Sequence, residues 1–125
     1  MSHESSAVVA SGVFDLALAL FHATFWRLFR WPQSLGSLGH INRNILYILN
    51  LAVAALFTLM GALLITYRSD VATTSLGAAL LWGLSLFWLA RAALQPQMFG
   101  LKKPLSVVLF GVFLLGSILH GWAAL

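Results

Sequence analysis

The sequence predicts an all-α membrane protein with four transmembrane helices in an antiparallel up-down bundle. Hydrophobic residues make up 61% of the 125 residues and charged residues only 8%, whereas a soluble domain carries about 25% charged residues. Four apolar runs are each long enough to cross a hydrocarbon core about 30 Å thick, which takes about 20 helical residues. We therefore expect residues 1–125 to form a single four-helix transmembrane domain.

The first apolar run covers about residues 8–28 and ends in an aromatic and basic segment, residues 25–31, which we call the collar. Tryptophan beside arginine is typical of the membrane–water boundary. The residues before the run contain no Lys or Arg, and Asp15 interrupts its apolar centre. Because a cleaved signal peptide needs a basic leader and an uninterrupted core, we expect a retained helix.

The second apolar run covers about residues 44–67. A polar connector precedes it, and Asn42 and Asn44 are expected to cap the helix there. The run is followed by a short linker, residues 71–74, which leads to the third run.

The third and fourth runs cover about residues 75–95 and 105–125. Thr74 or Ser75 is the expected N-cap of the third helix. Pro96 is expected to end that helix, because proline removes a helical donor and its ring clashes with the preceding turn.

The distribution of basic residues indicates the orientation, because cytoplasmic connectors carry an excess of Lys and Arg. The N-terminal segment, the second connector and the C-terminal segment together hold only Arg68. We therefore expect a multi-pass protein, of the kind found in a bacterial inner membrane, with both termini outside the cytoplasm. The residues that place the first and third connectors in the cytoplasm are Arg27, Arg30, Arg43, Arg91, Lys102 and Lys103.

Several classes of function are disfavoured by what the chain lacks. It contains no cysteine, so thiolate catalysis, iron–sulfur ligation and cysteine zinc sites are excluded. No phosphate-binding loop or hydrolase motif is present, and the sequence does not favour an enzyme. We predict no catalytic residues, no metal site and no cofactor. The basic residues are scattered rather than gathered on one helix face, so nucleic acid is not an expected partner.

Polar residues of three helices fall at similar depths when each residue is given a rise of about 1.5 Å. His22 and Asn50 each lie about 9 Å from the same side of the membrane, and Arg91 about 6 Å. Tyr47 and Trp88 lie one turn from Asn50 and Arg91. These five residues are the predicted ligand-binding site, in which Arg91 supplies charge and the others supply hydrogen bonds or an aromatic wall.

Asp15 and His120 form a second predicted pair, a proton relay about 8–10 Å from the opposite side of the membrane. Ionisable groups inside a membrane are costly and commonly mark function. Structural alternatives stay open: Arg91 can extend to the headgroups, Asn50 can join helices, and His120 can lie at the interface.

Three functions follow from these residues. The first is a small ligand-binding, lipid-binding or accessory subunit built around the intramembrane polar residues. The second is a proton-coupled transporter that acts as a dimer, and the third is a structural or assembly partner without a small-molecule site. The expected partners are the lipid bilayer, a small-molecule or lipid ligand, and a second copy or another membrane subunit.

Overall fold

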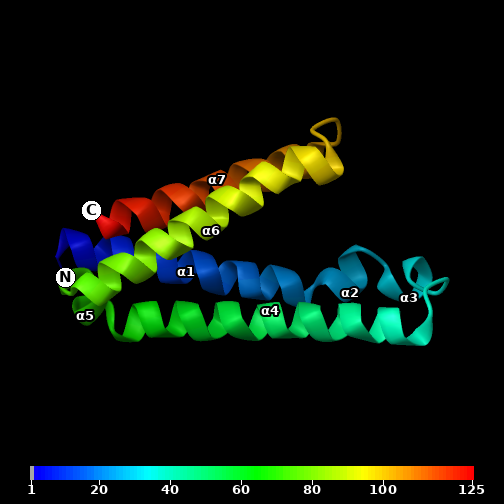
Figure 1. The fold of residues 1–125 in the computed structure, drawn as a ribbon, viewed down its shortest axis with the longest axis horizontal. Helices are drawn as coiled ribbons and strands as arrows, with labels where there is room; N and C mark the ends of the chain where they lie inside the picture. The colour runs from blue at the N-terminus through cyan, green and yellow to red at the C-terminus, as the bar shows by residue number, and fades with distance from the viewer. Residues whose placement is uncertain (1) are drawn as a thin grey trace. The chain divides into compact units, whose positions relative to one another are not determined.

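Four long apolar helices make up most of the computed structural model, which describes residues 2–125 (Figure 1). They are α1 (His3–Ala23), α4 (His40–Thr66), α6 (Ser75–Phe99) and α7 (Pro104–Ala124). Three short helices lie in the connectors: α2 (Phe25–Leu28), α3 (Trp31–Ser34) and α5 (Arg68–Thr73). Each long helix is long and apolar enough to cross a membrane, so the predicted all-α, four-span membrane fold is confirmed.

Helix α1 begins and ends about five residues earlier than the sequence predicts. The hydroxyl of Ser2 accepts a hydrogen bond from the Ser5 amide at 3.1 Å, which is how an N-cap starts a helix. At the other end, the Thr24 hydroxyl donates to the Phe21 carbonyl at 2.6 Å. Such local bonds compete with the helical pattern. The first part of the collar therefore folds as the separate helix α2 instead of extending α1.

One prediction about the connectors is wrong. Helix α4 starts at His40, so Asn42 and Asn44 lie inside its first turns and do not cap it. The Arg43 amide donates instead to the Gly39 carbonyl at 3.0 Å. The predicted linker before α6 is mostly helical, because α5 runs to Thr73.

Helix α6 starts where predicted but does not stop at Pro96. Thr74 is its N-cap, and its side chain accepts from the Gly77 amide at 3.0 Å. Pro96 lies inside the last turns, where the loss of one donor still allows the helix to continue to Phe99. Gly100, at a φ of 70°, ends the helix, because glycine adopts positive φ without steric cost.

The chain folds as two compact units, of which one contains Gly12–Leu63. In this unit, α1 and α4 lie antiparallel and side by side (Figure 1). A Cβ added at Gly61 of α4 would lie 2.7 Å from the Gly12 carbonyl oxygen of α1. Small residues thus allow the two backbones to approach closely, as is usual in membranes.

The other unit contains the N-terminal residues up to Ser11 together with Leu64–Leu125. Its main feature is the antiparallel pair α6 and α7 (Figure 1). Buried residues recur every three or four positions along α6 and every three, four or seven positions along α7, which places them on one face of each helix. They are Gly77, Leu81, Ser85, Trp88, Ala92 and Gln95 on α6, and Ser106, Phe113, Gly116, His120 and Ala123 on α7.

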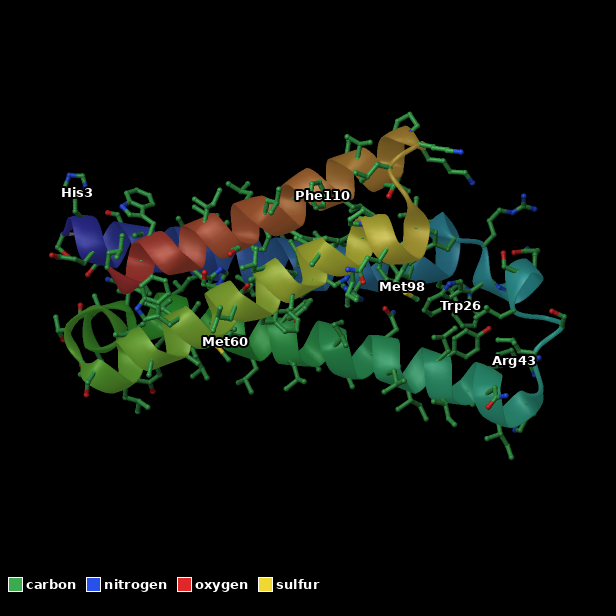
Figure 2. The ribbon with its side chains drawn as sticks, turned by 45° about the horizontal axis from the view of Figure 1, so that its top comes forward. His3, Trp26, Arg43, Met60, Met98 and Phe110 are labelled. Carbon is green, nitrogen blue, oxygen red and sulfur yellow. The ribbon has the colours of Figure 1, made fainter. Side chains whose placement is uncertain are left out.

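Most of α4 is exposed, as expected for a helix that faces lipid. Its exposed large side chains include Ile41, Ile48, Leu51 and Leu56. Side chains project outward along this helix in Figure 2, where Met60 is labelled. Contact of the protein with the lipid bilayer follows from these apolar surfaces.

Candidate functional site

His22 and Asn50 join α1 and α4 through two hydrogen bonds. The His22 Nδ1 lies 2.9 Å from the Asn50 Oδ1. The Asn50 Nδ2 donates to the backbone carbonyl of His22, also at 2.9 Å. One asparagine side chain thus contacts both the ring and the main chain of a single residue on the neighbouring helix.

The bond from the Asn50 Nδ2 to the His22 carbonyl determines which atom carries the hydrogen in the bond between the two side chains. A carbonyl oxygen only accepts, so the Asn50 atom facing it is the amide nitrogen. The Asn50 oxygen therefore faces the imidazole, and the His22 Nδ1 must carry the proton and donate. In a neutral ring, Nε2 is then left as an acceptor.

Aromatic rings surround the His22 imidazole. The Phe25 ring lies 4.3 Å from it between centroids, at an interplanar angle of 32°. The Phe57 ring approaches edge-on at 5.5 Å. The pair with Asn50 is half-buried and flanked by apolar rings, where a hydrogen bond is electrostatically stronger than in water.

Tyr47 belongs to a different cluster. Its ring lies 4.5 Å from that of Trp26 and 5.6 Å from that of Trp31. Tyr47 lies less than one turn before Asn50 in α4, yet its aromatic contacts are with the collar. It supports the collar against the start of α4.

Arg91 and Trp88 lie on α6, next to Phe113 of α7. The Arg91 guanidinium carbon lies 4.3 Å from the Phe113 ring centroid, a cation–π distance. The Trp88 ring stacks on Phe113 at 5.8 Å and 11°. The Arg91 Nη1 also donates to the Gln95 Oε1 at 3.2 Å. The charge of Arg91 is thus balanced by a ring quadrupole and an amide oxygen.

Gln95 continues this network toward the α6–α7 connector. Its Nε2 donates to the Ser106 hydroxyl at 2.9 Å, and Ser106 donates to the Gly100 carbonyl. The sequence did not indicate a role for Gln95 and Ser106, because residue 95 was expected to end a helix. The available signal was spacing, since Gln95 lies one turn after Arg91 and shares its face.

Asp15 and His120 are both buried, with exposed fractions of 1% and 0%. The His120 Nδ1 lies 2.7 Å from the Gly116 carbonyl, so Nδ1 carries the proton and donates. Nearby, the Ser85 hydroxyl of α6 donates to the Ser117 carbonyl of α7 at 2.8 Å. The sequence did not predict these polar contacts either.

None of the predicted site residues lines either of two open surface cavities in the described residues. One, of about 390 Å³, is bounded by His3, Glu4, Ala7, Trp122, Ala123 and Leu125. The other, of about 320 Å³, is bounded by Trp26, Arg27, Arg30, Pro32 and Gln33. Within residues 2–125, no group of three His, Asp or Glu side chains is placed to coordinate a metal ion.

Comparison with known proteins assigns no function to these residues. No protein-family model matches the chain, and no curated protein or solved structure is significantly similar to it. The chain is a small four-span helical membrane protein.

Proposed function

We propose that the protein is an accessory membrane subunit in which polar side chains within the spans fix how its helices pair. The observation that carries this proposal is the reciprocal contact of His22 and Asn50. Each group satisfies the other, which is the behaviour of interhelical hydrogen bonds in membranes. Arg91 is likewise balanced by Gln95 and Phe113. The Asn50 amide and the His22 Nδ1 are already bonded to each other within the protein, which favours a structural role for this pair over the predicted ligand-binding role.

A double-mutant cycle tests this role. His22→Ala and Asn50→Ala should each lower the free energy of unfolding. The coupling energy between them should be about 0.6 kcal/mol, the value for one interhelical bond. Only the bond between the His22 ring and the Asn50 Oδ1 is lost in both variants, because the backbone carbonyl of His22 remains in His22→Ala. The measurement is unfolding of the full chain by SDS in mixed micelles, followed by circular dichroism.

Thr58→Ala is the matched control, because the Thr58 hydroxyl bonds within α4, to the Ala54 carbonyl at 2.8 Å. It should change stability by less than about 0.5 kcal/mol. Additive effects of His22→Ala and Asn50→Ala would contradict the structural role. A small molecule that stays bound to the natural protein and is absent from both variants would also contradict the structural role.

Proton-coupled transport is the second candidate, and the burial of Asp15 and His120 in membrane-spanning helices supports it. A buried acid that carries protons loses this ability when it is replaced by its amide. Asp15→Asn should therefore abolish proton flux into liposomes that contain an entrapped pH-sensitive dye, while the helical content stays unchanged.

Asp70→Asn is the control for this experiment, because Asp70 is an exposed acid outside the long helices. Its flux should equal that of the natural protein. Absence of flux from the natural protein, or equal flux in Asp15→Asn, would reject proton transport and leave the accessory role unaffected.

A further inference from the structure

The segment after α1 contains a cavity with two arginines in its wall. The cavity has a volume of about 320 Å³ and is bounded by Trp26, Arg27, Arg30, Pro32 and Gln33. None of these residues takes part in the helix-pairing contacts of His22, Asn50 or Arg91. Trp26 is labelled in Figure 2, on the segment that leads from α1 to α3.

The backbone at Arg30 gives the cavity its shape. Arg30 has a φ of 50° and a ψ of 50°, the left-handed conformation, and lies between α2 and α3. Its carbonyl accepts from the Gln33 amide at 3.1 Å and from the Ser34 amide at 2.8 Å. A residue other than glycine seldom adopts this conformation, and such residues gather at functional sites. The turn lets Arg27, Arg30 and Gln33 border one space.

Aromatic contacts hold the wall in place. The Trp26 ring packs against Tyr47 of α4 at 4.5 Å between centroids. The Phe25 ring contacts Phe29 edge-on at 4.9 Å and Trp31 at 5.9 Å. These contacts hold Trp26 and the backbone of the segment in place, whereas the Arg27 and Arg30 side chains are exposed.

The charge of the cavity favours an anion. Within residues 2–125, neither the Arg27 nor the Arg30 guanidinium forms a salt bridge or a side-chain hydrogen bond. The only acidic residue in the same unit is Asp15, which is buried. Two guanidinium groups and the Gln33 amide are suited to a phosphate, because arginine donates paired hydrogen bonds to its oxygens.

The surroundings of the cavity favour a lipid over a free anion. The cavity directly follows a membrane-spanning helix. Its lining residue Trp26 is 49% exposed, and Leu28, the next residue after Arg27 in the chain, is 48% exposed. Tryptophan and arginine together are typical of the headgroup level of a bilayer. An apolar rim next to a cationic cavity matches a molecule with acyl chains and a negative headgroup.

We propose that this collar cavity binds the phosphate headgroup of an anionic phospholipid, with Arg27 and Arg30 holding the phosphate and Trp26 lying beside the glycerol region. The site is independent of the accessory role proposed above. It gives the protein a preference for anionic over zwitterionic lipid.

Native mass spectrometry tests the site with the full chain in detergent micelles, titrated with phosphatidylglycerol or with phosphatidylcholine of the same acyl chains. The natural protein should prefer phosphatidylglycerol. Arg30→Gly and Arg27→Gln should each weaken its binding about fivefold. Arg30→Gly is informative because glycine keeps the left-handed backbone while the guanidinium is removed.

Arg68→Gln is the matched control, since it removes the same charge from an exposed arginine whose side chain bonds to the Ile65 carbonyl. Its affinity for phosphatidylglycerol should equal that of the natural protein. Equal weakening in all three variants, or no lipid preference in the natural protein, would overturn the proposal. A third result would be that inorganic phosphate binds to the natural protein and not to Arg27→Gln, while the natural protein shows no lipid preference. The cavity would then be a site for a free anion, and the lipid assignment would be overturned.

Discussion

Gly77→Ala is expected to destabilise the protein by about 3 kcal/mol, the upper part of the range for overpacking in a rigid core. A Cβ at this position would lie 2.5 Å from the Val71 Cα and 2.6 Å from the Val71 carbonyl carbon, with the carbonyl oxygen closer still. These are backbone atoms of α5, so rotation of a side chain cannot relieve the clash. The free energy of unfolding, measured by SDS titration in mixed micelles, should fall accordingly.

Gly83→Ala and Gly111→Ala are the controls for this prediction. A Cβ at either position meets nothing within 4 Å. Alanine is the better helix former by roughly 0.5–1 kcal/mol, so both variants should be as stable as the natural protein or more so. Equal stability of Gly77→Ala and Gly83→Ala would show that α5 does not pack against the start of α6 as the structure describes.

Trp88→Ala is expected to cost about 3–5 kcal/mol, the usual range for truncation of a buried large aromatic side chain. Trp88 is only 1% exposed. Its loss would leave a cavity beside Phe113 and remove the ring that stacks on it. Phe113 in turn lies under the Arg91 guanidinium, so the truncation should also loosen this cation–π contact. The measurement is again the free energy of unfolding in mixed micelles.

Trp82→Ala, on the same helix, is the matched control, because the Trp82 side chain is 46% exposed. Its cost should stay well below that of Trp88→Ala, since nearly half of the removed surface is exposed. A similar loss of stability in both variants would mean that α6 does not present the Trp88 face to α7.

The four spans could be predicted because they depend on composition averaged over about 20 residues. Their ends could not, because single hydrogen bonds decide them. The Thr24 hydroxyl bond that separates α1 from the collar is one example. Pro96 is another, since the sequence gives no sign that the helix continues past it to Gly100.

The candidate site, like the helices, could be predicted from the sequence only in part. Depth along each helix follows from the rise per residue, and His22 and Asn50, estimated at equal depth, lie within hydrogen-bond distance. The direction in which a side chain points around the helix depends on tertiary packing. For this reason the sequence did not predict that Tyr47 contacts Trp26 and Trp31. Two roles stay predictions: the proton relay of Asp15 and His120, and the ligand-binding site of His22, Tyr47, Asn50, Trp88 and Arg91.

The hydrogen bonds at the α6–α7 connector have a consequence for how the protein is made. Gln95, Ser106 and the Gly100 carbonyl satisfy one another across the turn that joins the two helices. A polar group that enters hydrocarbon alone is costly, whereas one that is already paired is not. The two C-terminal helices are therefore expected to leave the insertion machinery as one preassembled hairpin.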